Sequence, residues 1–213
     1  MDGAHGPLNH DGMRVDTAWG IWDHTPLPDV VALLRELRAP WWVAGGYAIE
    51  RAVGRAYREH EDIDVALPRR DQLAARRLLD GWDPHVALDG TLRPWEAGET
   101  LAAQAHDIWV RERPGGPWRF QLMLDETDGG QWVYRRDHRI RRPLAGLTVA
   151  DDGFRRLAPE VQLLYKAKGV RPKDEADFAA VLPVLTDDQR RWLAEALEIE
   201  HGTHPWLSRM SGL

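Results

Sequence analysis

The sequence predicts an α/β protein of the α+β kind, in which a mixed-sheet domain is followed by a small helical domain. Two observations favour this class. Short apolar runs separated by turn residues dominate the chain up to about residue 145. Beyond that point apolar residues recur at the helical spacing of three and four. We therefore expect a loose arm over residues 1–20, a sheet domain over 21–145 and a helical domain over 146–213.

The first elements of the expected sheet domain alternate between helix and strand. A proline and an aspartate suit the first turn of the first helix. A glycine pair ends the next apolar run and a proline ends the one after it, as turn residues do at strand ends. In chain order we expect a helix over 28–38, a strand over 41–44, a short helix over 47–53, a strand over 63–67 and an amphipathic helix over 69–79.

The remaining elements are a hairpin, an edge strand and three helices. Two prolines interrupt residues 82–100, whose structure the sequence leaves open. A Pro-Gly-Gly-Pro turn at 114–117 separates two apolar runs and predicts the hairpin. In order, we expect strands over 106–111, 118–124 and 132–134, and helices over 158–168, 172–182 and 187–199.

The composition excludes several classes of protein. The 213 residues include no cysteine, which excludes disulfides and thiolate metal sites. No run reaches the ~18 apolar residues that a membrane span requires. The N-terminal sequence lacks the basic and apolar parts of a secretory signal, so we expect a cytoplasmic protein with no membrane partner. The net charge of −6 makes a long nucleic acid an unexpected partner and favours small substrates, cationic ones included.

Asp62 and Asp64 are the first candidate functional residues. They are two positions apart at the start of an expected strand, so both carboxylates point to the same face. Two like charges side by side are unfavourable unless a cation compensates them. Mg²⁺ ions that bridge a triphosphate would do so. The alternative is a strand-entry aspartate next to a surface aspartate.

The glycine pair Gly45-Gly46 is the second candidate feature. A glycine turn before a helix allows phosphate oxygens to approach the backbone N–H groups of Gly46 and of the helix that begins at Tyr47. The alternative is a tight strand-to-helix turn that binds no ligand. The glycine turn and the aspartate pair lie on consecutive strands joined by a helix, and this combination indicates phosphoryl or nucleotidyl transfer.

Residues 41–68, WWVAGGYAIERAVGRAYREHEDIDVALP, contain both features. This segment resembles the core of the DNA polymerase β-type nucleotidyltransferase superfamily, in particular the branch of aminoglycoside 2''-adenylyltransferases and lincosamide nucleotidyltransferases. The resemblance implies Mg²⁺-dependent transfer of AMP from ATP, or of another nucleotide, to a hydroxyl of a small molecule. It implies metal binding by Asp62 and Asp64, and nucleotide binding by Gly45, Gly46, Tyr47, Arg58 and His60.

Other readings remain open for the residues that the resemblance adds. A histidine that supports the site while bonded to the backbone, and an arginine in a surface salt bridge, are the alternatives for His60 and Arg58. Residues 159–168, PEVQLLYKAK, and 171–178, RPKDEADF, resemble the helical part of such proteins, where a lysine often approaches the phosphates. Lys166 is the first candidate for that role and Lys168 the second; a solvated helix lysine is the alternative.

The third carboxylate that the superfamily usually carries on a later strand is missing from its expected position. In residues 118–125, WRFQLMLD, that position holds Gln121. Glutamine accepts a hydrogen bond but cannot act as a base. Asp125, four residues further on the same face, is the first candidate for the catalytic role, and Asp107 on the preceding strand is another. A different register, or weak or lost transfer, would also explain the glutamine.

The acceptor is expected between the sheet and the C-terminal helices. If it is aminoglycoside-like, Glu96, Glu99 and Asp107 would contact its ammonium groups. Transfer to RNA or protein, as in toxin-type nucleotidyltransferases, is favoured by an arginine cluster over 135–142 and disfavoured by the net charge. A non-catalytic nucleotide-binding protein is the alternative that Gln121 suggests. The identity of the acceptor, the nucleotide and the oligomeric state are left open.

Overall fold

The computed structural model describes residues 15–210, which form twelve strands and seven α-helices. The strands are β1 Val15–Thr17, β2 Gly20–Trp22, β3 Trp42–Val43, β4 Asp64–Pro68, β5 Asp83–Leu88, β6 Thr91–Pro94, β7 Asp107–Arg111, β8 Phe120–Asp128, β9 Gln131–Val133, β10 Arg141–Pro143, β11 Thr148–Ala150 and β12 Arg155–Leu157. The helices are α1 Leu27–Leu34, α2 Gly45–Val53, α3 Gln72–Leu78, α4 Pro159–Lys166, α5 Pro172–Val181, α6 Asp187–His201 and α7 Pro205–Met210. None of these helices is both long and apolar enough to cross a bilayer.

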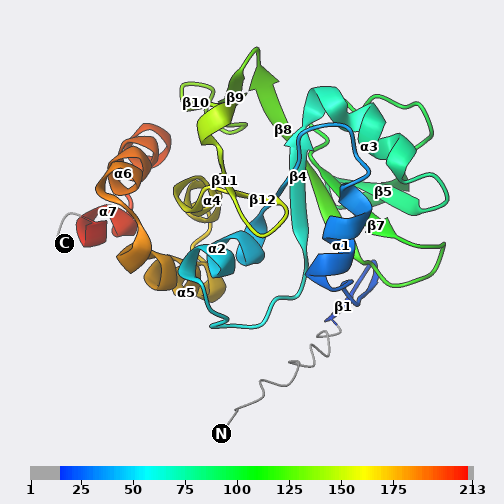
Figure 1. Ribbon diagram of the computed structural model, residues 1–213, viewed down its shortest axis with the longest axis horizontal. Coiled ribbons are helices and arrows are strands. Elements are labelled where there is room, and N and C mark those ends of the chain that lie inside the picture. The colour runs from blue at the N-terminus through cyan, green and yellow to red at the C-terminus, as the bar shows by residue number, and fades with distance from the viewer. Residues whose placement is uncertain (1–14, 211–213) are drawn as a thin grey trace, which may run out of the picture.

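Ten strands form one mixed sheet, which confirms the predicted fold class. Their order is β11-β12-β3-β4-β8-β7-β5-β6, and β9 pairs with β8 while β10 pairs with β9. Strands β1 and β2 form a separate ribbon. Figure 1 shows α1 and α3 on one side of β4, and α2 and α4 to α7 on the other.

Strand β4 defines the two faces of the sheet. It pairs in parallel with β8 and antiparallel with β3. Val65 and Leu67 pack into a core that includes α1 and α3, whereas Ala66 packs into a second core with α2 and the C-terminal helices. Side chains two residues apart share a face. Asp64 therefore points to the side of Ala66, toward the C-terminal helices.

The C-terminal helices share their core with the sheet. Apolar side chains of α4, α5 and α6 join Trp42, Trp132 and Tyr134 of the sheet domain in one buried cluster. Phe178 of α5 stacks on Trp206 of α7, with ring centroids 4.3 Å apart. This continuous packing fixes the helices over the face of β4 that carries Asp64.

The helical part begins later than the sequence predicts. Residues 148–157 form the hairpin β11–β12, and Arg156 pairs with Val43 so that β12 extends the sheet beside β3. Gly153, with φ of +78°, makes the turn. The expected boundary at residue 145 is too early, because the chain returns to the sheet before α4 begins at Pro159.

The loose-arm prediction is wrong for residues 15–20, which belong to the ribbon β1–β2. The Trp118 indole donates a hydrogen bond of 2.9 Å to the carbonyl oxygen of Trp19. The backbone N–H of Trp118 donates one of 2.8 Å to the carbonyl oxygen of Ile21. These bonds attach the ribbon to the chain just before β8. Residues 1–14 of the expected arm lie outside the described residues.

The other predicted elements are confirmed with shifted ends. The first helix stops at Leu34, and the predicted helix over 69–79 contains a 3₁₀ turn, Arg69–Asp71, before α3. The undecided region forms the hairpin β5–β6, whose turn residues Asp89 and Gly90 have φ values of 50° and 71°. Positive φ at both central residues is typical of a two-residue type I′ turn.

Candidate active site

A cavity of about 400 Å³ lies between the sheet and the C-terminal helices. The sheet contributes Asp64, Ala66, Met123 and Asp125, and the segment after β9 contributes Arg135 and Arg136. The helical part contributes Gln162, Tyr165, Lys166, Lys168, Arg171 and Asp174. Asp64, Asp125, the first glycine of the turn (Gly45) and both candidate lysines therefore meet at one cavity, whereas Asp62 and Gly46 do not line it.

Asp64 starts β4 and faces this cavity, while Ile63 before it is buried in the opposite core. Among residues 15–210, neither Asp62 nor Asp64 has a side chain that accepts a hydrogen bond or joins an ion pair. Burial, and then the charge of Asp62, raise the pKa of Asp64 to about 8, although Lys166 acts in the opposite direction. The folded chain thus presents an uncompensated pair of acids, which a cation would stabilise.

The first glycine of the pair, Gly45, is required by the backbone and by its neighbour. It has φ of +63°, and a Cβ there would collide with the Asp64 carboxylate. Its N–H donates a hydrogen bond of 2.7 Å to Gln162 Oε1. The N–H of Gly45 is therefore already taken, so Gly45 shapes the turn and lets Asp64 approach it.

Gly46 and Tyr47 lie in the first turn of α2, where backbone N–H groups have no acceptor inside the helix. Such N–H groups favour anions. A Cβ on Gly46 would collide with the side chains of Arg58 and His60. The Arg-x-His part of the motif therefore packs directly against the glycine turn, which explains why these sequence features occur together.

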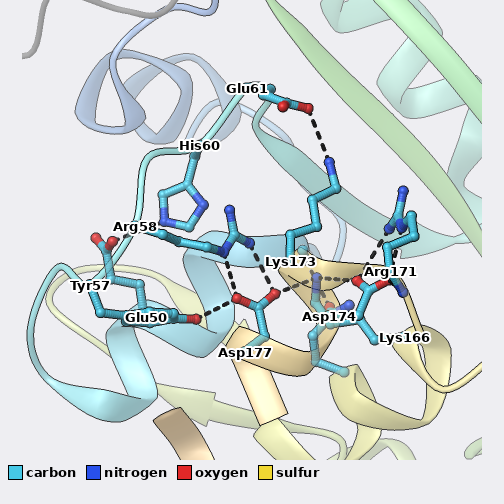
Figure 2. A network of polar contacts seen from close by, with 12 residues as sticks. Glu50, Tyr57, Arg58, His60, Glu61, Lys166, Arg171, Lys173, Asp174 and Asp177 are labelled. Carbon is cyan, nitrogen blue, oxygen red and sulfur yellow. Dashed lines mark hydrogen bonds and ion pairs between the residues drawn. The ribbon is translucent and has the colours of Figure 1, made fainter. Parts of the chain in front are cut away.

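Arg58 is held by a buried carboxylate rather than facing the cavity. Its Nε and Nη2 atoms donate hydrogen bonds of 2.6 and 2.9 Å to Asp177, which is fully buried on α5. Tyr57 donates a third hydrogen bond of 2.6 Å to Asp177. Figure 2 shows Asp177 between Arg58 and Lys166. The loop before β4 is thereby fixed to α5.

His60 lies behind the glycine turn. Its Nε2 is 2.9 Å from Glu50 Oε2, and its ring is 4.2 Å from that of Tyr47. Burial is the main cause that lowers its pKa, against the effect of Glu50. His60 does not line the cavity, so its position is that of a supporting histidine, but its partner is the Glu50 side chain rather than the backbone.

Both candidate lysines reach the cavity, in different states. Lys166 is only 9% exposed and lies 2.7 Å from Asp177 and 3.4 Å from Asp174. Lys168 is exposed, and within residues 15–210 it joins no ion pair. Arg171 also lines the cavity and is bound to Asp174 at 2.8 Å. Arg171 begins the segment RPKDEADF, which resembles the helical part of the family, but the sequence does not predict that Arg171 lines the cavity.

The strand register places the candidates for the third carboxylate at different distances from Asp64. Asp64 pairs with Gln121, whereas Asp125 pairs with Pro68. At about 3.3 Å per residue, Asp125 lies about 13 Å further along the sheet. Asp107 lies nearer to Asp64. Its charge raises the pKa of Asp64, and its Oδ1 accepts a 3.2 Å hydrogen bond from Nε2 of Gln121, the residue that pairs with Asp64.

Asp125 shares the cavity but has its own surroundings. It is 6% exposed, and its Oδ1 accepts a hydrogen bond of 2.8 Å from the Tyr165 hydroxyl. Its Oδ2 has no hydrogen-bond partner among the described residues, 15–210. Burial raises the pKa of Asp125 to about 6, while the hydrogen bond from Tyr165 and the nearby indole N–H groups of Trp132 and Trp42 lower it. In the sequence, the one sign that Asp125 faces the cavity is its spacing of four residues from Gln121, which puts both side chains on the same face of the strand.

Glu96 and Glu99 do not lie at the cavity, so the expected contact with the acceptor is not met. They follow β6, the edge strand of the sheet on the far side of β7 and β5. Trp95 is buried there and donates a hydrogen bond to the Glu99 carbonyl at 3.0 Å, which folds this turn back onto the edge. Both Glu99 carboxylate oxygens are bound by Arg93.

A strand that begins at the second aspartate of an Asp-x-Asp motif, beside a glycine turn and with two lysines at the end of α4 facing the same cavity, is typical of the DNA polymerase β-type nucleotidyltransferase superfamily. Residues 26–181 match the model of the aminoglycoside-2''-adenylyltransferase family. The match covers most of the chain, and the protein therefore belongs to this family. The predicted superfamily branch is thus confirmed.

Curated relatives match a shorter segment. Two 2''-aminoglycoside nucleotidyltransferases, from Klebsiella pneumoniae and Escherichia coli, are each 40% identical to this chain over 53 residues. That segment is 24% of this chain and 30% of each relative. The chain therefore spans less than a third of the length of the curated relatives it matches.

Two solved structures share the fold. The lincosamide antibiotic adenylyltransferase LnuA, bound to lincomycin, superposes with a TM-score of 0.53 and 14% identity over 76% of this chain and 99% of its own. ANT(2'')-Ia in complex with adenylyl-2''-tobramycin gives 0.54 and 16% over 80% of this chain and 94% of its own. At these identities the likeness shows the fold alone.

Proposed function

We propose that the protein is a Mg²⁺-dependent adenylyltransferase that transfers AMP from ATP to a hydroxyl of a small molecule, of the aminoglycoside or lincosamide kind. The observation that carries the proposal is the convergence of Asp64, the first turn of α2 and Lys166 on one cavity. The antibiotics bound in the two structural neighbours support a small-molecule acceptor.

The residues present fit a magnesium ion that is shared with the nucleotide. Asp62 and Asp64 carry carboxylates without donors or ion-pair partners among the described residues. No group of three or more His, Cys, Asp or Glu side chains within residues 15–210 could hold a metal ion on its own. Mg²⁺ is commonly bound by one or two carboxylates together with substrate phosphates. We therefore assign Asp62 and Asp64 to the metal and expect ATP to complete its ligands.

The protein groups around the cavity suit a triphosphate. The N–H groups of Gly46 and Tyr47 would bind phosphate oxygens at the start of α2. Lys166 lines the cavity together with Asp64 and pairs with the two acids of α5, and Lys168 and Arg171 extend the positive charge along the same wall. Bound Mg²⁺ would supply electrostatic stabilisation of the charge that develops on the α-phosphate and on pyrophosphate.

The reaction transfers the α-phosphorus between two oxygens. The acceptor hydroxyl oxygen forms a bond to that phosphorus, the bond to the bridging oxygen of the β-phosphate breaks, and pyrophosphate leaves with the bond electrons. The hydroxyl proton must pass to a base. We assign this role to Asp107, which lies on the cavity-facing side of β7 and is held by Gln121 Nε2 at 3.2 Å. Gln121 would orient this base rather than replace it.

Transfer to RNA is less well supported, because ion pairs occupy most of the arginine cluster. Arg139, Arg141 and Arg142 bind Asp137, Asp128 and Glu160 respectively, each at 2.6–2.8 Å. Of the cluster, Arg135 and Arg136 alone line the main cavity. A non-catalytic nucleotide-binding protein is the second candidate function, and Gln121 at the position of the missing carboxylate favours it.

One experiment separates these functions. The full chain is incubated with α-labelled ATP, Mg²⁺ and a panel of aminoglycosides and lincosamides, and labelled product and pyrophosphate are measured. We expect Mg²⁺-dependent transfer that Asp62→Asn or Asp64→Asn abolishes, and that Asp107→Asn slows by ~10²–10⁴, the usual share of a general base. The exposed change Asp128→Asn is the matched control. ATP binding without transfer to any acceptor would support the non-catalytic function instead.

A further inference from the structure

Gln162 of α4 is a buried polar side chain that no step of the proposed reaction uses. It is 6% exposed and lines the cavity together with Asp64. Its Oε1 accepts the hydrogen bond of 2.7 Å from the backbone N–H of Gly45. Because an N–H group can only donate, the atom that faces it must be the amide oxygen. This partner therefore fixes the orientation of the Gln162 amide, and the NH₂ group lies on the other side of the amide carbon.

The amide nitrogen of Gln162 has no partner of its own. Within residues 15–210, Nε2 donates no hydrogen bond to Asp64 or to any other group. Asp125 Oδ2 is unbonded and enclosed by protein, whereas Gln162 Nε2 is not among the enclosed unbonded atoms of the described residues. This nitrogen therefore stays open to the cavity that Gln162 lines. Since buried polar groups are nearly always paired, the open donor indicates a ligand group that accepts a hydrogen bond.

The contacts of Gln162 place this donor beside the proposed metal site. Gly45, to which Gln162 is bonded, lies so close to Asp64 that a Cβ on Gly45 would overlap the Asp64 carboxylate. Lys166 follows Gln162 by four residues on α4, and side chains at this spacing share one face of a helix. The face of α4 that meets the glycine turn thus presents an amide donor and an ammonium group to the same cavity.

The chemistry of this wall favours phosphate as the group that accepts from Gln162. A protonated amine has no lone pair to accept with, which excludes the ammonium groups of an acceptor. Phosphate oxygens accept hydrogen bonds, and Lys166, Lys168 and Arg171 give the wall the positive charge that attracts them. A neutral amide adds a donor for phosphate without placing a further positive charge beside Asp64, where it would repel Mg²⁺. The acids and the amide therefore suit different parts of one ligand.

We infer that Gln162 is a nucleotide-binding residue: its Nε2 donates a hydrogen bond to a phosphate oxygen of the bound triphosphate, while its Oε1 holds the glycine turn beside Asp64. The inference rests on the proposed function for the identity of the ligand and adds a residue to its nucleotide site. Gln162 belongs to the helical part and the glycine turn to the sheet. A triphosphate that the turn and Gln162 bind together therefore contacts both walls of the cavity.

The test separates the two atoms of the amide by calorimetric titration of the full chain with a non-hydrolysable ATP analogue and Mg²⁺. Gln162→Glu keeps an oxygen for the N–H of Gly45 but replaces the donor with a second oxygen, so the affinity for the analogue should fall at least about tenfold. Gln162→Met removes both polar atoms at a similar side-chain length and should lose at least as much. Gln104→Glu makes the same charge change at an exposed position away from the cavity and should stay within about twofold of the unaltered protein.

The outcomes separate this inference from the proposed function. Full affinity in Gln162→Glu with a loss in Gln162→Met would show that Gln162 only holds the turn, and would overturn the phosphate contact. Full affinity in both variants would overturn it as well. If the unaltered protein did not bind the analogue, the adenylyltransferase itself would be contradicted, and the role of Gln162 with it. Thermal melting without ligand checks that every variant folds. If Gln162→Glu does not fold, full affinity in a folded Gln162→Met still overturns the inference.

Discussion

At the scale of single residues, the absence of a Cβ at Gly46 leaves the space that Arg58 and His60 occupy. A Cβ at this position would collide with Arg58 and His60, and φ at Gly46 is not positive, so the constraint is one of space rather than of backbone conformation. Arg58 and His60 thus pack into the volume that a side chain at position 46 would occupy.

Gly46→Ala should therefore destabilise the fold and weaken nucleotide binding together. Overpacking of this kind costs about 1–3 kcal/mol, because Arg58 and His60 must move. Gly130→Ala is the control, since a Cβ there meets nothing within 4 Å. The measurements are thermal unfolding and titration with a non-hydrolysable ATP analogue. If Gly46→Ala and Gly130→Ala behaved alike in both, the packing account of the glycine would be wrong.

Asp125 makes stability depend on pH in a defined direction. Burial raises its pKa from 3.8 to about 6 in the folded protein. Below about pH 3 the group is neutral in both states, so it has no effect there. As the pH rises from about 4 to 6, the unfolded chain ionises first, and the free energy of unfolding falls by at most about 3 kcal/mol.

Asp125→Asn should abolish this fall in the free energy of unfolding, because asparagine does not ionise. The variant should become progressively more stable than the unaltered protein between about pH 4 and pH 6, with a constant difference above that range. Urea unfolding at a series of pH values measures the difference. Asp128→Asn, which changes an exposed carboxylate of the same strand, is the control. Parallel pH profiles for Asp125→Asn and the unaltered protein would contradict a raised pKa.

At the scale of elements, Asp177 of α5 joins the loop before β4 to the C-terminal helices. It accepts hydrogen bonds from Tyr57 and Arg58 and pairs with Lys166 at 2.7 Å, while fully buried. Burial alone would raise its pKa, but these partners outweigh it and the pKa lies below the ordinary value. Removing the Asp177 carboxylate would therefore leave the positive charges of Arg58 and Lys166 without this buried partner.

Asp177→Asn should consequently destabilise the protein by about 3–5 kcal/mol, as expected when one partner of a buried ion pair is removed. The exposed Asp187→Asn, which loses only a surface pair with Arg190, should change stability by less than about 1 kcal/mol. Chemical denaturation measures both. A small effect of Asp177→Asn would show that the loop and α5 are held together by packing instead.

The sequence predicts the features that depend on local pattern, but it does not predict those that depend on how distant strands pair. The glycine turn, the aspartate pair and the helix that carries Lys166 follow from spacing and from the short segment around Trp42. That Gln121 lies beside Asp64 and binds Asp107 depends on how β4, β7 and β8 pair, which no local pattern fixes. The short strands β10 to β12 escaped prediction for the same reason: three residues carry too little periodicity, and distant partners define them.

At the scale of the whole molecule, the cavity lies between two parts of the chain that share one core. Apolar residues of α4 to α7 and of the sheet form a continuous cluster, and Gln162 of α4 binds the N–H of Gly45 at 2.7 Å. A ligand that contacts both walls should therefore stabilise the sheet and the helices together, although the sequence predicted two domains.

We accordingly expect a single thermal transition that nucleotide shifts as a whole. At an ATP analogue concentration of about 100 Kd with Mg²⁺, linkage adds about 2.7 kcal/mol to the free energy of unfolding. For a chain of this size that corresponds to a rise in Tm of about 5–11 °C. Asp64→Asn should lose most of the rise, because the metal-bridged phosphates lose a ligand, whereas Asp128→Asn should keep it. Scanning calorimetry tests this directly. Two transitions, of which nucleotide moved only one, would show that the helical part unfolds independently and that the ligand contacts a single wall of the cavity.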